Sequence, residues 1–300
     1  MFSGSLVAIV TPMGADGAID FEAWDALLDL HVQAGSSGIV VAGSTGESTT
    51  LLEREVFDLL RRAKVRLKNR VPLIGGIGGS GTAAVAERVR AMSAEPVDGI
   101  LVTTPAYNRP TQEGLYQHFA AVAAAAARPI IVYNVPSRTA VDMLPATIVR
   151  LAKLSPIVAV KEATGELERV AQIRVGTDDR LAVLSGDDPT ACEAVLGGAR
   201  GVISVTANVV PAAMAAMIGA ALRGERAVAE RLDAPLRKLH QELFIEPNPI
   251  PVKWALAEMG LIRKGIRLPL TWLGEPAQAQ LGRTLRQALH DVAPAQAMSA

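Results

Sequence analysis

A lysine that ends an apolar, β-branched segment is the residue of this chain best suited to covalent chemistry. Lys161 follows residues 157–160 (IVAV) and precedes Glu162. Burial disfavours an ammonium group and lowers its pKa, which yields a neutral amine able to attack a ketone and form an imine. The alternative, a salt bridge to Glu162, is disfavoured because adjacent residues of a strand point to opposite faces. We therefore expect Lys161 to be a catalytic amine.

Two tyrosines follow or end neighbouring apolar segments. Tyr133 ends the fifth such segment of the chain, and Tyr107 follows the fourth. A phenol hydrogen-bonded to another hydroxyl can pass protons to and from a carbinolamine, which imine formation requires. On position alone, either tyrosine could equally pack as an amphipathic side chain at a rim. Together with a strand-end lysine, both become candidates for proton transfer.

Two further segments have groups that suit a carboxylate. Residues 43–47 (GSTGE) close the second apolar segment, and their glycines allow backbone N–H groups to converge on an anion, with the hydroxyls of Ser44 and Thr45 as added donors. Arg138 follows Tyr133 in a loop, where a guanidinium can hold a carboxylate through two hydrogen bonds. The alternatives are simple helix capping by Ser44 or Thr45 and a solvated loop arginine.

Eight short apolar segments, each usually followed by a turn and a helical pattern, would position these residues. Near-continuous apolar strands that alternate with helices indicate a parallel sheet covered by helices, and eight such units indicate a closed (β/α)8 barrel of the TIM type, an α/β fold. Catalytic residues of such barrels project from the carboxyl ends of the strands. The eight expected strands are residues 6–10, 38–42, 71–74, 99–102, 129–133, 157–161, 181–185 and 201–205.

After the eighth segment only helical periodicity remains. We expect helices at residues 211–222, 227–243, 251–259 and 276–289. No glycine- and serine-rich linker precedes them, so the chain is expected to be one globular unit, with a barrel over residues 1–225 and a C-terminal helical extension over 226–300 packed on it.

The composition narrows the classes of partner. The 300 residues contain 30 basic and 30 acidic side chains, which favours a small-molecule ligand and neither nucleic acid nor a membrane surface. The single cysteine, Cys192, is compatible with a reducing compartment and is expected to be a packed thiol. The N-terminal residues lack the pattern of a signal peptide, so a cytoplasmic location is expected.

Two other kinds of chemistry receive less support. Residues 76–81 (GIGGSG) match the dinucleotide-binding pattern G-x-G-x-x-G, but the next strand does not end in the acidic residue that would hold a ribose, so we interpret these glycines as a tight turn. The four histidines are scattered and form no spaced ligand set with each other or with the cysteine, so each is expected to be a helix or surface residue and no metal is expected.

Taken together, the motifs resemble the dihydrodipicolinate synthase and N-acetylneuraminate lyase family, from about residue 3 to about residue 289. They occur in the order typical of that family. The matching segments are residues 42–47 (AGSTGE), 107–110 (YNRP), 133–139 (YNVPSRT), 161–165 (KEATG), 185–188 (SGDD) and 246–253 (EPNPIPVK).

The resemblance implies an activity, a carbon-oxygen lyase reaction in lysine and diaminopimelate biosynthesis. Pyruvate would condense on Lys161 as a Schiff base, and the enamine would attack L-aspartate 4-semialdehyde to give 4-hydroxy-tetrahydrodipicolinate. Ser44 and Thr45 would hold the pyruvate carboxylate, and Arg138 the carboxylate of the aldehyde. No cofactor beyond the covalent pyruvate imine would be needed.

The resemblance also implies further site residues and an assembly. Tyr133 would transfer protons at the imine, linked to Ser44 and to Tyr107, which in this family comes from a neighbouring subunit. Gly186 and Ile203 would line the pyruvate pocket. The family typically forms a homotetramer built from tight dimers.

Two features depart from the synthase pattern. Ser44 replaces the usual threonine, and the segment 43–47 (GSTGE) also resembles N-acetylneuraminate lyase, whereas Arg138 in residues 137–139 (SRT) favours the synthase. The positions that bind the feedback inhibitor lysine in inhibited relatives are here Ser80, Ala84 and Ala106, without a charged partner or aromatic wall. We therefore expect weak or absent inhibition by lysine.

Alternative hypotheses remain open from the residues alone. Another 2-keto-acid aldolase would share the lysine and tyrosine but cleave a different substrate. A nucleotide-binding oxidoreductase would use residues 76–81 (GIGGSG), and a non-catalytic sensor would bind a keto acid without turnover.

Overall fold

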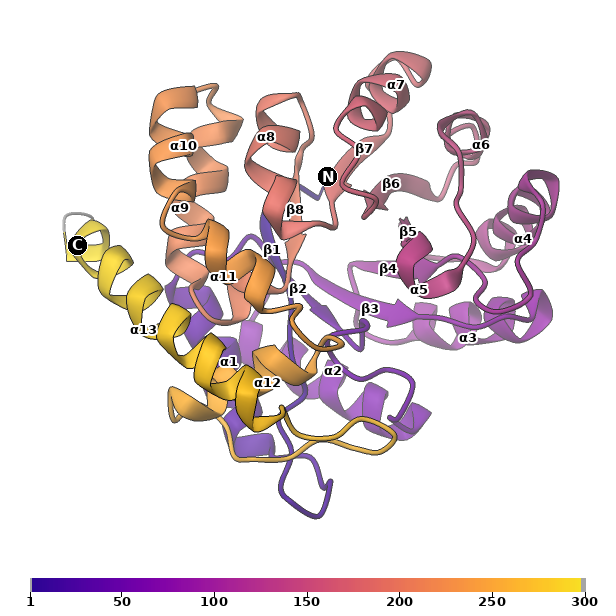
Figure 1. Cartoon of the computed structure of the whole chain (residues 1–300). Coiled ribbons are helices and arrows are strands. Elements are labelled where there is room, and N and C mark those ends of the chain that lie inside the picture. The colour runs from indigo at the N-terminus through magenta and orange to yellow at the C-terminus, as the bar shows by residue number, and fades with distance from the viewer. Residues whose placement is uncertain (1, 298–300) are drawn as a thin grey trace.

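The computed structural model describes residues 2–297, and these form a closed barrel of eight parallel strands in sequence order (Figure 1). Each strand pairs with the next, and β8 closes the barrel against β1 with Leu6 opposite Ile203. The predicted (β/α)8 architecture is confirmed. The strands are β1 (Gly4–Ala8), β2 (Gly38–Val41), β3 (Leu73–Ile77), β4 (Gly99–Thr103), β5 (Ile130–Asn134), β6 (Ile157–Glu162), β7 (Ala182–Ser185) and β8 (Gly201–Ser204).

Buried apolar residues cover both faces of the barrel strands. Alternate residues of a strand point to opposite faces, and accordingly Ala159 belongs to the cluster inside the barrel, whereas Val160 packs in the larger cluster outside it. Tyr133 also belongs to the inner cluster, one residue after Val132 of the outer cluster. The two-residue period therefore sets which side chains face the barrel interior.

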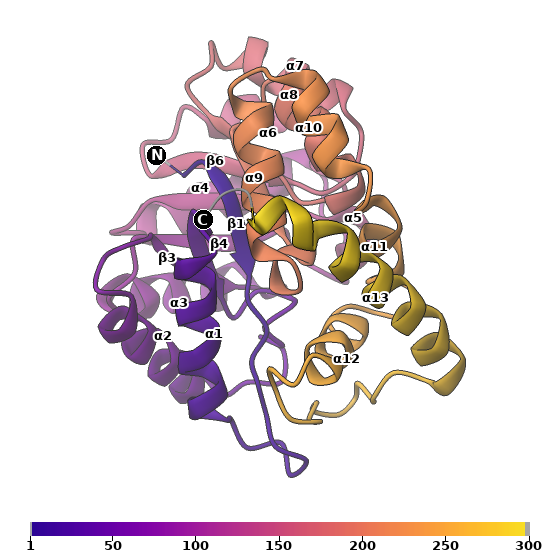
Figure 2. The ribbon, with the colours of Figure 1, turned by 90° about the vertical axis from the view of Figure 1, so that its left-hand side faces the viewer.

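Helices surround the barrel and continue beyond it. The view from the side (Figure 2) shows the long C-terminal helix crossing the outside of the molecule. The α-helices are α1 (Phe21–Gln33), α2 (Glu53–Leu67), α3 (Thr82–Ala94), α4 (Gln112–Ala125), α5 (Pro136–Thr139), α6 (Pro145–Leu151), α7 (Glu168–Gly176), α8 (Ala191–Leu196), α9 (Pro211–Leu222), α10 (Arg226–Asp233), α11 (Arg237–Glu242), α12 (Ile250–Glu258) and α13 (Glu275–Ala297).

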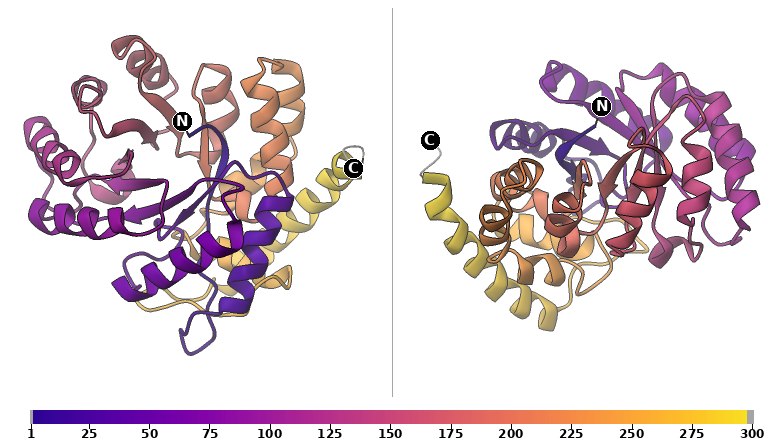
Figure 3. Two further views of the ribbon diagram at one scale, coloured as in Figure 1. Left: turned by 180° about the vertical axis from the view of Figure 1, so that it is seen from behind. Right: turned by 90° about the horizontal axis from the view of Figure 1, so that it is seen from above.

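The C-terminal helices pack against the barrel and against one another. Helix α13 contacts α9, α11 and α12. Figure 3 shows this C-terminal helix, in yellow, from two further sides. Leu281 and Leu285 of α13 belong to the same buried cluster as the outer residues of the strands. The boundary at residue 225 falls between α9 and α10; the division into a barrel of residues 1–225 and a packed helical extension of residues 226–300 stays a prediction.

Some boundaries differ from those expected. The helix predicted for residues 227–243 is two helices, because Pro235 lacks an N–H donor and disfavours helical geometry in the residue before it. Strands β1 and β3 are shifted by about two residues from the predicted segments, since a fully apolar run does not mark its own ends. Within residues 2–297, no helix is long and apolar enough to cross a membrane.

Candidate active site

A cavity of about 600 Å³ opens at the carboxyl ends of the strands. Its walls come from the loop after β2, from β5 and β6, from the residues that follow β7, and from the residues between α11 and α12. Six of the predicted site residues line this single cavity, namely Ser44, Thr45, Tyr133, Arg138, Lys161 and Gly186. Segments that are up to about 140 residues apart thus converge as expected for strand ends of a barrel.

Lys161 and Tyr133 are paired across neighbouring strands. Their Cα atoms are register partners in the β5–β6 ladder, and the Lys161 Nζ lies 4.3 Å from the centroid of the Tyr133 ring. Burial lowers the pKa of Lys161 to about 8; the charge of Asp188 opposes this shift and that of Arg138 adds to it. At neutral pH, on the order of a tenth of the protein therefore has the uncharged amine. A buried amine with a lowered pKa is suited to act as a nucleophile, as expected from the sequence.

The hydroxyl of Tyr133 is kept protonated in the unliganded site. Burial raises its pKa to about 12, whereas the charge of Arg138 and a hydrogen bond with Ser44 oppose the shift. A protonated phenol in contact with a second hydroxyl can donate a proton to a developing alkoxide or carbinolamine. The contact between Tyr133 and Ser44 suits proton transfer; that these residues carry it out stays a prediction.

The loop that carries Ser44 and Thr45 is a series of turns. Gly46 and Ser48 both donate their N–H groups to the carbonyl of Gly43. Helix α2 begins at Glu53, so its N-terminus does not directly follow Ser44 and Thr45. Binding of an anion at this loop would therefore rely on the backbone N–H groups and hydroxyls of the turn more than on the dipole of α2.

Arg138 lies on the short helix α5, directly after the strand that contains Tyr133. Its Nη2 donates a 2.9 Å hydrogen bond to the backbone carbonyl of Asn248, which also lines the cavity. Asn248 was not selected from the sequence as a site residue, although it lies in the matching segment of residues 246–253 (EPNPIPVK). A second basic group thus faces the cavity from a position fixed by the C-terminal residues.

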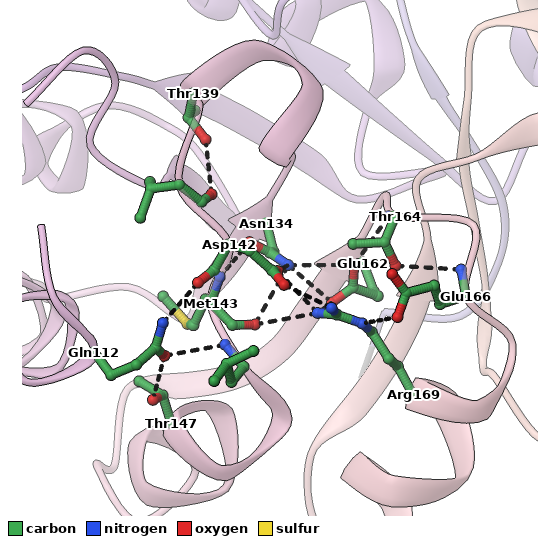
Figure 4. Close-up of polar contacts among 12 residues, drawn as sticks. Gln112, Asn134, Thr139, Asp142, Met143, Thr147, Glu162, Thr164, Glu166 and Arg169 are labelled. Atoms are coloured by element: carbon green, nitrogen blue, oxygen red, sulfur yellow. Dashed lines mark hydrogen bonds and ion pairs between the residues drawn. The ribbon is translucent and has the colours of Figure 1, made fainter. Parts of the chain in front are cut away.

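A polar network holds the ends of β5 and β6 on the outside of the barrel (Figure 4). Asn134 follows Tyr133, and Glu162 follows Lys161; the Asn134 side-chain amide donates to the Glu162 carboxylate at 3.1 Å. Burial raises the pKa of Glu162, while hydrogen bonds from Asn134 and Thr164 and the nearby charge of Arg169 oppose that shift. Glu162 therefore points away from Lys161, as predicted.

Arg169 is the cation of this network. It forms two hydrogen bonds with the Asp142 carboxylate, at 2.9 and 2.6 Å, and a third with Glu166 at 2.8 Å (Figure 4). The Asn134 amide also donates to Asp142 at 2.9 Å, and its carbonyl oxygen accepts from the backbone of Met143. The network fixes Asn134 and Glu162, the outward-facing last residues of β5 and β6. It thereby also fixes the inward direction of Tyr133 and Lys161, which precede them.

Gly186 is required by close packing around the lysine. A Cβ atom at this position would lie 2.7 Å from the Ala163 Cβ and 2.9 Å from the Lys161 Cε. Ile203, the other residue expected to line the pyruvate pocket, is buried in the inner cluster of the barrel and does not line the cavity. Its expected contact with pyruvate stays a prediction.

Tyr107 lies outside this cavity. Its side chain is 92% exposed, and its backbone has a φ of 75°, in the left-handed region that non-glycine residues rarely adopt. The neighbouring Arg109 also has a positive φ of 46°. The site of one chain does not include Tyr107; its expected contribution to a second subunit is not tested by a single chain.

The glycine-rich segment, the cysteine and the histidines, which by residue type could serve nucleotide, thiol or metal chemistry, lie in or next to strands and helices of the fold. Gly76 lies within β3 and not in a turn, and a Cβ there would come 2.3 Å from the carbonyl oxygen of Ala42. Cys192 is buried in α8, and burial raises the pKa of its thiol to about 11. His31, His118, His240 and His290 all lie in helices, and residues 2–297 contain no cluster of side chains suited to a metal ion.

A closed (β/α)8 barrel with a buried lysine of lowered pKa at its mouth is typical of lyases that act on carbonyl compounds. The comparisons with known proteins agree with this class. The chain belongs to the dihydrodipicolinate synthetase family, whose model matches residues 1–288. The family membership expected from the sequence is thus confirmed.

Individual relatives are similar over nearly the whole chain. The 4-hydroxy-tetrahydrodipicolinate synthase of Methylococcus capsulatus is 50% identical over 288 residues, which are 96% of this chain and 99% of the relative. That of Alcanivorax borkumensis is 51% identical over 287 residues, 96% and 98% of the two chains. The crystal structure of a chloride-inhibited dihydrodipicolinate synthase from Acinetobacter baumannii, complexed with pyruvate, has a TM-score of 0.94 and 44% identity, with 96% and 99% of the chains covered.

Proposed function

We propose that the protein condenses pyruvate with L-aspartate 4-semialdehyde to give 4-hydroxy-tetrahydrodipicolinate, with pyruvate bound as an imine of Lys161. The observation that carries this proposal is the buried Lys161 amine, with its pKa lowered to about 8, next to the Tyr133 ring in a cavity of about 600 Å³. Pyruvate in a relative's crystal structure and the names of the relatives support the choice of substrates.

The reaction follows from the groups in the cavity. The Lys161 amine attacks the ketone carbon of pyruvate, and the resulting carbinolamine loses its hydroxyl as water when Tyr133 supplies a proton. Loss of a methyl proton gives an enamine, whose carbon attacks the aldehyde carbon of the second substrate. The amino group of that substrate then attacks the imine carbon, closes the ring and releases Lys161.

The charges of the cavity match two carboxylate substrates. The backbone N–H groups of Ser44 and Thr45, with their hydroxyls as added donors, would hold the carboxylate of pyruvate near Lys161. The guanidinium of Arg138 would hold the carboxylate of the aldehyde through paired hydrogen bonds. No metal or organic cofactor takes part in this scheme.

Trapping of the imine tests the proposal. Borohydride reduction in the presence of pyruvate, followed by intact-mass measurement and peptide mapping, should give one pyruvate-derived adduct on Lys161. Lys253 is an internal control, because it is also buried but is paired with Glu47. The absence of an adduct, or an adduct on Lys253 instead, would refute the proposed mechanism.

A second reaction on the same scaffold deserves a direct comparison. The segment of residues 43–47 (GSTGE) also resembles N-acetylneuraminate lyase, which would form the same imine and cleave a sialic acid. Arg138 in the cavity favours a carboxylate-bearing aldehyde. A product assay with each substrate pair separates the two activities, since borohydride trapping alone does not.

We also propose that the protein works as a homotetramer in which Tyr107 completes the site of a neighbouring subunit. Its side chain is exposed and its backbone is held in a strained conformation, which suits a residue fixed for contact with another chain. Mixing inactive Tyr107→Phe and Lys161→Ala proteins under conditions of subunit exchange should restore activity. No restored activity, with exchange verified by mass, would place Tyr107 outside the site.

Regulation and location follow from the same assignment. Ser80 donates a 2.8 Å hydrogen bond to the carbonyl of Ala106, so two of the positions linked to lysine binding lie side by side. Neither these two residues nor Ala84 offers a charge to the ammonium of lysine, and we propose weak or absent inhibition. Strong inhibition by lysine below millimolar concentration would contradict it. A role in amino-acid biosynthesis fits the cytoplasm.

A further inference from the structure

Asn248 contacts both carboxylate-binding groups of the cavity. Its side-chain amide donates a 3.0 Å hydrogen bond to the Thr45 hydroxyl, and its backbone carbonyl accepts a 2.9 Å hydrogen bond from Arg138. Asn248 lines the cavity and is 5% exposed. A single residue of the C-terminal region therefore connects two groups that lie 93 positions apart in the sequence.

The contact with Thr45 sets the direction of its hydroxyl. A threonine hydroxyl has one O–H donor and two acceptor positions. Because the Asn248 amide can only donate to it, the hydroxyl hydrogen of Thr45 remains available for another acceptor. In this cavity that acceptor would be the carboxylate of the keto acid, so Asn248 favours the orientation that binds an anion.

The contact with Arg138 fixes one edge of the guanidinium. Arginine has five N–H donors in a rigid planar arrangement, and one of them is used by the Asn248 carbonyl. The remaining donors are free for a substrate carboxylate, in a plane that is already defined. A fixed guanidinium loses less conformational entropy when it binds its ligand.

Contacts of nearby C-terminal residues also fix the position of Asn248. Lys253, one turn into α12, forms a buried ion pair with Glu47, which follows Thr45 by two residues. The backbone N–H of Arg267 donates to the same carboxylate. The loop of residues 43–47 and the C-terminal region are therefore joined twice, by the hydrogen bond of Asn248 with Thr45 and by the ion pair of Lys253 with Glu47.

The stability of the fold alone does not explain why residue 248 is an asparagine. The Asn248 Oδ1 is buried and has no hydrogen-bond partner among residues 2–297. A buried polar atom without a partner costs stability, and such atoms are uncommon in folded proteins. An apolar side chain would avoid that cost, so the amide is better explained by its contact with Thr45.

We propose that Asn248 is a positioning residue that couples the keto-acid carboxylate site at Thr45 to the aldehyde carboxylate site at Arg138. This inference rests on the proposed function. The hydrogen bond from the Asn248 side chain to Thr45 also holds the backbone carbonyl of Asn248 that accepts from Arg138. The inference therefore predicts that the loss of this side chain weakens the binding of both substrates, although the carbonyl itself remains.

Two substitutions separate positioning from mere structural support. Asn248→Ala removes the donor to Thr45. It should raise the pyruvate concentration that gives half-maximal borohydride trapping about fivefold, because a net hydrogen bond typically changes a binding constant by about this factor. Asn248→Asp keeps the shape but turns the donor into an acceptor and adds a negative charge, so it should raise the same value by more than Asn248→Ala does. In both variants the KM for the aldehyde should also rise, with a smaller change in kcat.

A double-mutant cycle tests the route through Thr45. If Asn248 acts on pyruvate through the Thr45 hydroxyl, Asn248→Ala should have little further effect on trapping in a Thr45→Val background. Gln280→Ala is the matched control, because Gln280 links α13 to Glu242 of α11 at 3.1 Å and does not line the cavity. That control should leave the trapping concentration and both KM values unchanged.

The outcomes distinguish this inference from the proposed function. No trapping in the unsubstituted protein would overturn both. Normal trapping with unchanged half-saturation and unchanged aldehyde KM in Asn248→Ala would overturn the coupling alone, as would full additivity with Thr45→Val. Melting temperatures of all variants show whether a change in KM accompanies a loss of fold. A KM change of the same size in Gln280→Ala would also overturn the coupling.

Discussion

The carboxylate of Glu47 and the ammonium of Lys253, 206 positions apart in the sequence, form a fully buried ion pair. Glu47 belongs to the loop after β2, and Lys253 to α12. Glu47 also accepts a hydrogen bond from the backbone of Arg267 at 3.1 Å. The C-terminal helices are therefore fixed to the wall of the cavity by charge as well as by apolar packing.

Breaking this pair should be costly. Lys253→Met leaves a buried carboxylate without its cation and should lower the free energy of unfolding by about 3–5 kcal/mol. Chemical denaturation measures the change. Lys238→Met is the control, since Lys238 is 72% exposed and 3.8 Å from Glu242, and it should cost about 1 kcal/mol or less. Equal losses in the two variants would contradict the importance of burial.

The pH dependence of imine formation should report Lys161. Only the uncharged amine attacks the ketone, and the pKa of Lys161 is about 8. We expect kcat/KM for pyruvate to increase about tenfold per pH unit below this value and to level off above it. A profile that is flat between pH 6 and pH 8 would show that the lysine is uncharged throughout or that another step limits the rate.

The same shift affects stability in a defined direction. Folding lowers the pKa of Lys161 from 10.5 to about 8, so the unfolded chain binds more protons between these values. The cost of burying the amine is fully present below pH 8 and disappears as pH rises from about 8 to 10.5. Lys161→Met should therefore raise the free energy of unfolding at pH 7 by as much as about 3 kcal/mol while abolishing activity. The gain should shrink at pH 10; a gain that is independent of pH would argue against a charge effect.

A methyl group at Gly186 should interfere with the lysine. Gly186→Ala places a Cβ 2.9 Å from the Lys161 Cε and should reduce borohydride trapping by pyruvate on the order of tenfold, by displacing the amine. Gly81→Ala is the matched control, because nothing lies within 4 Å of its Cβ position. Equal trapping in both variants would show that the lysine adapts without loss.

The network behind the strand ends should contribute to stability. Arg169→Met removes the cation that holds Asp142 and lies 3.9 Å from Glu162, and it should cost about 3 kcal/mol or more in the free energy of unfolding. The exposed pair of Arg174 and Asp179 offers a comparison, for which Arg174→Met should cost about 1 kcal/mol or less. A small loss in Arg169→Met would mean that Asn134 alone orients Glu162.

The sequence by itself determined the barrel and most of the candidate site. Eight apolar segments predicted eight strands, because a parallel strand covered by helices is buried on both faces. A lysine at the end of such a segment indicated an amine with a lowered pKa, and the two-residue period of a strand placed Lys161 and Glu162 on opposite faces.

Only the tertiary structure decided how distant segments meet. The pairing of Lys161 with the Tyr133 ring depends on the register of β5 and β6, which strand patterns do not encode. The contacts of Asn248 with Thr45 and Arg138, and of Lys253 with Glu47, depend on how the C-terminal helices pack on the barrel. Local periodicity describes which face of an element is buried, whereas partners more than 100 residues away are selected by packing of the whole chain. For the same reason, the exposed Tyr107 acquires a partner only if a second chain supplies one.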